Sequence, residues 1–200
     1  MNEGSKQVLV SFSGEIIETT VADKTSVADD WVHNALSTHA GKRIILVGLD
    51  CKFSPHPISR MSGKISTLQL CLCTKCRVLQ LLHMNEFPQS IKTFLSMPSI
   101  TFVGIKIHEN THKLWKEYQL ICNKKMDVRA LAKIWFPISF HGTPSLRALA
   151  YEVAGLCMRK TEKPYKCDWE ARVLDDKLIE HACIGAYACY RIANKLLQEM

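Results

Sequence analysis

The segment RIILVGLD, at residues 43–50, restricts the fold of this chain more than any other stretch does. Six residues in a row, IILVGL, carry no polar side chain, and Asp50 follows them directly. A strand with one solvated face alternates apolar and polar residues, whereas an unbroken apolar run is typical of a strand covered on both faces. We therefore expect a central strand at 43–49 with a carboxylate at its end, inside a sheet that helices cover.

Shorter patterns predict the other strands of the sheet. Alternating apolar residues from Val8 to Val21, interrupted by Gly14, predict a two-stranded hairpin. The runs TLQLCLC and CRVLQLLH are separated only by Thr74 and Lys75, which predicts an antiparallel pair joined by a two-residue turn. The run ITFVGIKI predicts one further strand at 100–107.

Helical periodicity accounts for most of the remaining chain. The expected helices are 27–39 with Ser26 as the cap, 88–97, 110 onward, 127–136, 145–154 and about 175–199. No linker or internal repeat divides these elements, so we expect one domain over residues 1–200. Strands first and helices later predict an α/β fold class with a central mixed β-sheet flanked by helices.

The charge of the chain favours a polyanionic partner. The formal net charge is +7, of which residues 1–50 contribute −3 and residues 51–200 contribute +10. Such an excess attracts nucleic acid above all, although a solvated basic surface explains it equally well. Nine cysteines, several inside apolar runs, are typical of buried thiols in a reducing compartment, so we expect a cytoplasmic or nuclear location. No apolar stretch is long enough for a membrane span, so no membrane partner is expected.

Two short motifs are typical of metal sites, and for both we favour another explanation. His108 and His112 match the H-E-x-x-H pattern of zinc proteases, but a predicted strand ends just before His108. Asn110 is the expected helix cap, which leaves His108 outside the helix. Cys73 and Cys76 form a single C-x-x-C without a second pair. Across the predicted turn these two cysteines face each other, so packing is favoured over metal binding.

The last predicted helix and the loop before it carry two further features. Gly185 lies in the middle of the helix, where glycine costs about 1 kcal/mol relative to alanine, and His181 is one turn earlier on the same face. We interpret this face as one from which a bulky side chain is missing. The loop is basic and holds Tyr165 and Trp169, so it is a candidate single-strand contact, with a solvated loop as the alternative. Its cations are Arg159, Lys160, Lys163 and Lys166.

Together these segments resemble the DEDDy branch of the 3′-5′ exonucleases, which includes the Werner-syndrome exonuclease and, most similar to this chain, small stand-alone plant relatives. The resemblance runs from Glu15 to Leu197. Its most specific stretches are VGLDCKFSP, STLQLC, VLQLLH, PSITFVGIKIHENTHKL and DWEARVLDDKLIEHACIGAY. The resemblance implies an RNase H-like (DnaQ-like exonuclease) fold for the whole chain.

The chemistry that this resemblance implies is phosphodiester cleavage by two Mg²⁺ or Mn²⁺ ions, held by four carboxylates, with a tyrosine that orients the attacking water. The five motif positions, which are Asp, Glu, Asp, Tyr and Asp in the family, fall on Asp50, Lys52, Asn110, His181 and Gly185. Only Asp50 matches, and the charges at the four metal-ligand positions sum to zero. We therefore expect no bound metal. Glu109 is a candidate substitute for the residue missing at Asn110.

Three functions are compatible with the resemblance. The leading interpretation is a catalytically degenerate exonuclease-family protein that needs no cofactor and binds single-stranded RNA or DNA, or acts as an interaction module. Lys52 would then contact phosphate together with the four loop cations. The alternative is an active 3′-5′ exonuclease or exoribonuclease with altered chemistry. It would use Mg²⁺ or Mn²⁺ at Asp50, Glu109 and His181, or His181 as a general base. Here the chain resembles the RISC-interacting clearing exoribonucleases, ring-shaped homo-oligomers with sites at subunit contacts. The third is a scaffold that forms hetero-oligomers with an active relative.

Overall fold

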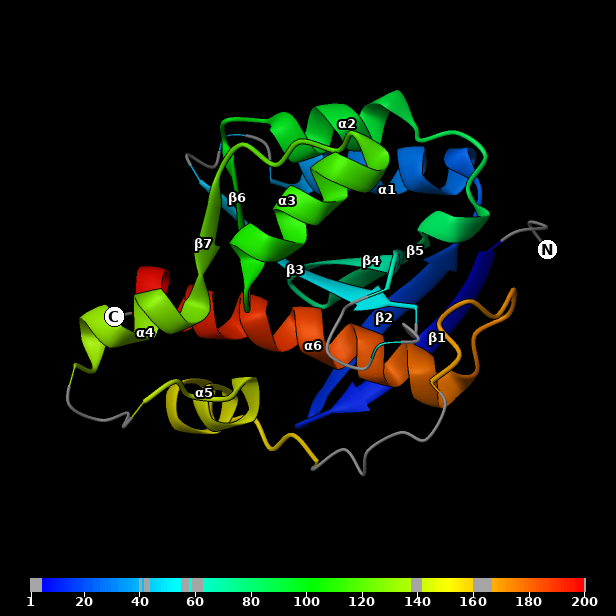
Figure 1. Cartoon of the computed structure of the whole chain (residues 1–200). Helices are drawn as coiled ribbons and strands as arrows, with labels where there is room; N and C mark the ends of the chain where they lie inside the picture. Colours follow the sequence, from blue (N-terminus) through cyan, green and yellow to red (C-terminus); the bar gives the residue numbers. More distant parts are fainter. Residues whose placement is uncertain are drawn as a thin grey trace.

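A seven-stranded mixed sheet lies at the centre of the protein, in the order β1-β2-β5-β4-β3-β6-β7 (Figure 1). The structure, a computed structural model, describes residues 5–39, 41, 44–54, 58, 63–137, 142–159 and 167–199. The strands are β1 (Ser5–Phe12), β2 (Glu15–Ala22), β3 (Ile45–Phe53), β4 (Ile65–Leu72), β5 (Lys75–Gln80), β6 (Ile100–Gly104) and β7 (Lys125–Asp127). β3 runs antiparallel to β4 and parallel to β6, and β2 runs parallel to β5. The predicted α/β class with a mixed sheet is confirmed.

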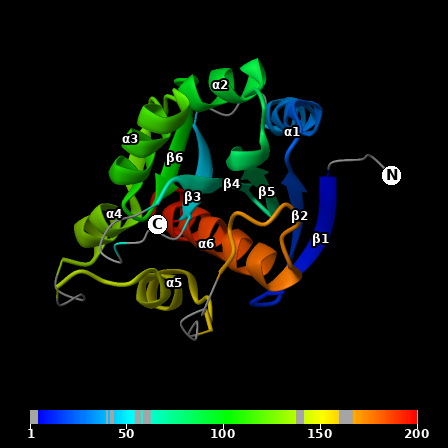
Figure 2. The same cartoon turned by 45° about the vertical axis from the view of Figure 1, so that its right-hand side comes forward.

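Helices cover both faces of this sheet, as the apolar run in β3 requires (Figures 1 and 2). One face carries α1 (Thr25–Thr38), α2 (Gln89–Ser96) and α3 (Ile107–Tyr118). The other carries α4 (Val128–Trp135), α5 (Leu146–Ala154) and α6 (Asp176–Asn194). A short 3-10 turn, η1 (Leu81–His83), follows β5, and a π-helical turn, η2 (Lys195–Glu199), follows α6. The described ranges contain no helix that is long and apolar enough to cross a membrane.

Strand β3 continues past the predicted end. Its pairing with β6 stops at Gly48, but its pairing with β4 continues from Gly48 to Phe53. Asp50 therefore lies inside the strand and not at its end. Because side chains alternate along a strand, Asp50 and Lys52 project from the same face.

Helix α6 crosses this face and is in direct contact with β3. A side chain at Gly48 would place its Cβ 2.0 Å from the backbone oxygen of Ala186, so only glycine allows the helix to come this close. Ala182, Cys183 and Ala186 are fully buried here. Small residues on both elements thus bring the middle of α6 over the polar end of β3.

One turn and one helix start differ from the sequence-based expectation. The β4–β5 turn is at Cys73 and Thr74, one residue earlier than predicted, and Cys76 pairs with Cys71. This register places Cys71 and Cys76 in the core beneath α6, whereas Cys73 takes a left-handed conformation at φ 53°. The predicted facing of Cys73 and Cys76 is therefore wrong. Ser26, the expected cap of α1, is inside that helix, because Lys24 is the extended residue before it.

Helix α3 begins at Ile107, so the prediction that Asn110 caps it was wrong. Lys106 is left-handed, with φ 50°, and its N–H donates to Asp127 Oδ2 over 2.8 Å. This turn ends β6 early, and Ile107 packs in the core from the helix instead of from a strand. His108 therefore belongs to the helix, contrary to our reason for rejecting a zinc site. Both histidines of the motif are exposed, and no group of three or more His, Cys, Asp or Glu side chains in the described ranges is placed to hold a metal.

Candidate functional site

The centre of the candidate site is an ion pair within β3. Lys52 Nζ donates to Asp50 Oδ2 over 2.7 Å, and the two side chains are only 16% and 23% exposed. The other carboxylate oxygen, Oδ1, accepts the backbone N–H of Cys51 over 2.9 Å. Both oxygens of Asp50 are thus engaged by groups of the same strand.

Gly185 of α6 lies directly over this carboxylate. A Cβ at position 185 would lie 2.5 Å from Asp50 Oδ2 and 3.6 Å from Lys52 Nζ. The space next to Gly185 is therefore filled by the β3 ion pair. This accounts for a glycine inside a helix, where the residue is otherwise unfavourable.

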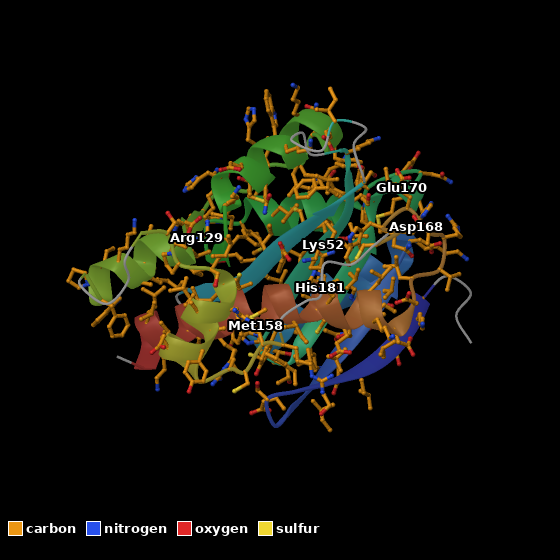
Figure 3. The ribbon with its side chains drawn as sticks, turned by 60° about the horizontal axis from the view of Figure 1, so that its bottom comes forward. Lys52, Arg129, Met158, Asp168, Glu170 and His181 are labelled. Atoms are coloured by element: carbon orange, nitrogen blue, oxygen red, sulfur yellow. The ribbon has the colours of Figure 1, made fainter. Side chains whose placement is uncertain are left out.

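His181, one turn before Gly185, lies close to Lys52 (Figure 3), and both charges of the ion pair act on its imidazole. Burial lowers the pKa of its imidazole, and the cation of Lys52 lowers it further, whereas Asp50 raises it, to a net value of about 4. His181 is consequently neutral at pH 7. A neutral imidazole can accept a proton or a hydrogen bond, but it adds no charge beside the ion pair.

Trp169 covers the ion pair from the segment that precedes α6. Lys52 Nζ lies 5.9 Å from the centroid of the indole, and the His181 ring centroid is 6.0 Å away. The segment is held to the sheet, because Gln80 Nε2 donates to the Ala171 oxygen over 3.0 Å. Trp169 is only 7% exposed, so it packs over Lys52 and His181 and is not the surface ring for bases that the sequence led us to expect.

A buried polar strip on β4 lies beside the ion pair and was missed in the sequence. Gln69 pairs with Asp50 across the sheet, and Thr67 pairs with Lys52. Both are fully buried, Gln69 Nε2 donates to Thr67 Oγ1, and Gln69 Oε1 has no hydrogen-bond partner in the described structure. The signal was present, because polar residues at every second position of TLQLC mark one face of a buried strand.

The remaining predicted motif residues lie at the start of α3. Asn110 is buried, and its Nδ2 donates to the Ile105 oxygen over 3.4 Å, within its own turn. Glu109 is exposed, and its Oε2 lies 3.8 Å from Lys106 Nζ. The structure thus brings Asp50, Lys52, His181 and Gly185 together and gives Asn110 and Glu109 contacts of their own. Of the predicted basic loop, Arg159 is exposed, and Lys160, Lys163 and Lys166 are outside the described residues.

These residues do not fit a pair of divalent cations. Mg²⁺ and Mn²⁺ require several hard oxygen ligands, mainly carboxylates. The group that converges here offers one carboxylate, whose two oxygens already accept hydrogen bonds, together with an ammonium, a glycine and a neutral imidazole. The chemistry that this arrangement supports is the binding of an anion by Lys52, with His181 and Trp169 beside it.

Comparison with known proteins relates this chain to nucleases, although no family model matches it. It is 25% identical over 194 residues to exonuclease 3′-5′ domain-containing protein 2 of Drosophila melanogaster, covering 95% of this chain and 32% of the relative. It is also 25% identical to a 3′-5′ exonuclease of Arabidopsis thaliana, covering 94% and 65%. The mouse bifunctional 3′-5′ exonuclease/ATP-dependent helicase WRN is 25% identical, over 94% of this chain and 13% of the relative. The chain thus spans less than two thirds of each of these relatives.

Solved structures show the same fold. Escherichia coli RNase D, an exoribonuclease, matches with a TM-score of 0.72 at 17% identity, over 90% of this chain and 44% of RNase D. The EXO domain of Aedes aegypti Nibbler matches with a TM-score of 0.71 at 10% identity, covering 88% and 85%. The chain is therefore similar along nearly its whole length to 3′-5′ exonuclease domains, and the predicted RNase H-like fold is confirmed.

Proposed function

We propose that this chain, similar in sequence and fold to 3′-5′ exonuclease domains, binds single-stranded nucleic acid and does not cleave it by two-metal chemistry. The observation that carries the proposal is the 2.7 Å contact between Lys52 Nζ and Asp50 Oδ2. Lys52 occupies a motif position that the family fills with glutamate, according to the resemblance. A cation here takes the place of a metal ligand and of the positive charge that the ligand would attract.

Charge accounts for the loss of metal binding. Two unit charges about 4 Å apart interact by roughly 4 kcal/mol at an effective dielectric constant of 20. Replacing a glutamate by Lys52 converts one such attraction into a repulsion towards any metal near Asp50. Four carboxylates would balance the charge of two divalent ions. The net charge of the residues at these four positions is zero, because Lys52 cancels Asp50 and both Asn110 and Gly185 are neutral.

The same cation supports nucleic-acid binding. An ammonium has three N–H donors, and Lys52 uses one of them on Asp50. The remaining donors suit a phosphodiester oxygen, the group that the relatives' names imply as substrate. The net charge of +10 over residues 51–200 attracts a polyanion to this part of the molecule.

Incubation of the purified chain with 3′-labelled single-stranded RNA and DNA tests both parts of the proposal. We expect binding that weakens steeply with salt, and no shortening of either strand with Mg²⁺, Mn²⁺ or chelator. Lys52→Met should weaken binding, and so should joint replacement of Lys160 and Lys163 by glutamate. Metal-dependent shortening that Asp50→Ala abolishes would overturn the proposal.

One observation favours the alternative of an active nuclease with altered chemistry. His181, whose pKa of about 4 keeps it unprotonated at physiological pH, lies beside Asp50 and has a free nitrogen to take a proton, although so low a pKa makes it a weak base. The same incubation separates the two functions, because a nuclease that uses His181 would form products that His181→Gln abolishes. An interface site completed by a second copy would in addition require a stable oligomer in sedimentation.

A further inference from the structure

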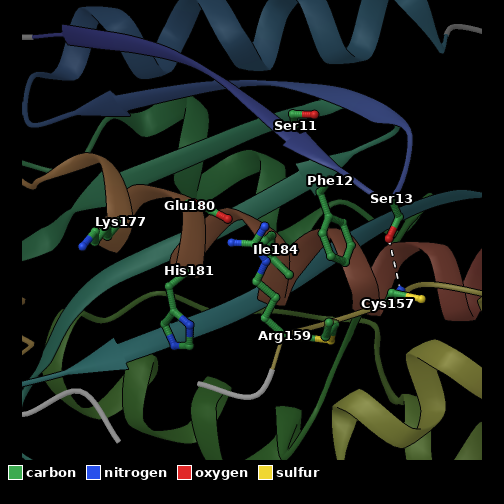
Figure 4. Close-up of a pocket in the computed structure, with 10 residues that line it drawn as sticks. Ser11, Phe12, Ser13, Cys157, Arg159, Lys177, Glu180, His181 and Ile184 are labelled. Carbon is green, nitrogen blue, oxygen red and sulfur yellow. Dashed lines mark hydrogen bonds between the residues drawn. The ribbon is translucent and has the colours of Figure 1, made fainter. Parts of the chain in front are cut away.

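A hollow on the hairpin side of α6 adjoins the Lys52–Asp50 ion pair through His181. Its volume is about 410 Å³, within the range of ordinary ligand pockets. One wall is a face of α6, where Lys177, His181 and Ile184 follow each other at helical spacing (Figure 4). The opposite wall combines the β1–β2 turn with the segment after α5. We name this the first hollow; its lining residues are Ser11, Phe12, Ser13, Cys157, Met158, Arg159, Lys177, Glu180, His181 and Ile184.

A second hollow of about 370 Å³ continues from the first. It lies against α5 and is lined by Ser145, Arg147, Ala148, Tyr151, Leu156, Cys157 and Met158. Cys157 and Met158 line both hollows, so the two are separated only by this short segment. The Lys52–Asp50 ion pair beside His181, the first hollow and the second hollow therefore form one series, which we name the track.

The segment that divides the two hollows is fixed by hydrogen bonds. Gly155 is left-handed at the end of α5, and its N–H donates to the Tyr151 oxygen. The Leu156 N–H donates to the Ala150 oxygen over 2.9 Å. The bond from Gly155 to Tyr151 is that of the αL motif, which commonly ends a helix. The Cys157 N–H then donates to Ser13 Oγ over 3.1 Å, which joins the segment to the β1–β2 turn (Figure 4). The walls of the track are consequently formed before any ligand binds.

The track carries cations that the fold does not use. Arg147, Arg159 and Lys177 are exposed, and in the described part of the chain none of them takes part in an ion pair. Glu180 is the only carboxylate among the described residues that line the two hollows. Tyr151, in the second hollow, is 60% exposed, which leaves its ring free to stack.

We propose that the track holds several successive nucleotides of a single strand that extends from Lys52 to Tyr151. Arg159 and Lys177 contact phosphates in the first hollow and Arg147 contacts one in the second, where a base stacks on Tyr151. Spaced cations with an exposed ring suit a single strand, whose bases are free to turn towards an aromatic face. This inference rests on the proposed function and adds a binding length to it.

Binding of fluorescent oligonucleotides of increasing length tests the two hollows separately from the site at Lys52. We expect an octanucleotide to bind at least about tenfold more tightly than a dinucleotide, since each base stacked on an aromatic ring contributes about five- to a hundredfold. Tyr151→Leu should remove about tenfold of the octanucleotide affinity, whereas Tyr151→Phe should retain it. Arg147→Glu and Lys177→Glu should each lower the salt slope by about 0.7 or more. None of these variants should change dinucleotide binding.

Lys92→Glu is the matched control, because it makes the same charge change at an exposed position of α2, on the opposite face of the sheet. It should change the octanucleotide affinity much less than Lys177→Glu. Equal effects of the two variants, or equal affinity for the two oligonucleotide lengths, would overturn binding along the track. The proposed binding of nucleic acid at Lys52 would remain intact. Binding of an acidic peptide in competition with the octanucleotide, at similar affinity, would identify a protein ligand instead. Failure of every oligonucleotide to bind would overturn the proposed function itself.

Discussion

A side chain at Gly185 would place its Cβ 2.5 Å from Oδ2 of Asp50, a separation that no carbon and oxygen tolerate without movement. The shapes of α6 and β3 are thus complementary at Gly185 and Asp50. The glycine in α6 provides the space that the carboxylate in β3 occupies. The Asp50 carboxylate cannot move freely, because it accepts hydrogen bonds from Cys51 N–H and Lys52 Nζ.

Gly185→Ala should therefore destabilise the protein only while Asp50 is present. Alanine gains about 1 kcal/mol of helix propensity, but overpacking against an anchored carboxylate costs about 1 to 3 kcal/mol. We expect a net loss of about 1 kcal/mol in the wild-type background and a gain in the Asp50→Ala background. Urea unfolding of the four proteins of this double-mutant cycle measures the coupling. Additive effects of the two substitutions would contradict the assigned contact.

Gly48→Ala should be far more damaging. Its Cβ would lie 2.0 Å from the backbone oxygen of Ala186, and backbone cannot rotate away as a side chain can. Relief requires α6 to separate from β3, which opens the core beneath the helix. We expect a loss of more than about 3 kcal/mol, or no folded protein, measured by circular dichroism and urea unfolding. Near-native stability would show that α6 does not pack on β3 at this point.

The central part of the fold could be predicted from local sequence, because burial leaves a local pattern. The apolar run before Asp50 identified β3, and Gly14 identified the first hairpin turn. The exact position of the β4–β5 turn could not be predicted, because the turn contains no glycine or asparagine and the register of the two strands requires Cys73 to be left-handed. The start of α3 depends on Lys106 binding Asp127, a contact between distant parts of the chain.

The convergence of the candidate site was predicted through the resemblance. Asp50, Lys52, His181 and Gly185 do converge, although strand and helix are far apart in the sequence. The position of Trp169 was not predictable. Its place over Lys52 is set by the attachment of its segment to Gln80, which no short-range pattern indicates.

The low pKa of His181 makes stability depend on pH. Burial, followed by Lys52, lowers the pKa from about 6.5 in the unfolded chain to about 4 in the folded protein. Between these values the unfolded chain binds more protons. The stability contributed by neutral His181 is therefore complete above about pH 6.5 and is lost as the pH falls towards 4. The contribution is at most about 3 kcal/mol, less any screening by solvent.

Urea unfolding between pH 4 and pH 7 measures this dependence in His181→Gln, which should flatten the profile. His33→Gln, at an exposed position of α1, is the control and should leave the slope unchanged. Lys52→Met should raise the pKa of His181, which an NMR titration of the imidazole records. An unchanged titration in Lys52→Met would show that burial alone lowers this pKa.

Introducing the motif residues that the resemblance implies tests whether this fold supports cleavage. The variant with Lys52→Glu, Asn110→Asp, His181→Tyr and Gly185→Asp has the four carboxylates and the tyrosine that the resemblance implies for two-metal chemistry. Lys52→Glu also removes the cation that holds Asp50 against Gly185, so Asp50 is free to move away from a new side chain. We expect this variant to shorten 3′-labelled single strands in Mn²⁺ and the wild-type chain not to. Each single substitution should do almost nothing, because catalytic groups that act as a unit are strongly non-additive.

The control adds Asp50→Asn to the fourfold variant and should abolish the activity. A folded fourfold variant that binds the strand but forms no product in Mn²⁺ would show that Asn110, whose described contacts lie within its own turn, is too far from Asp50 to share a metal.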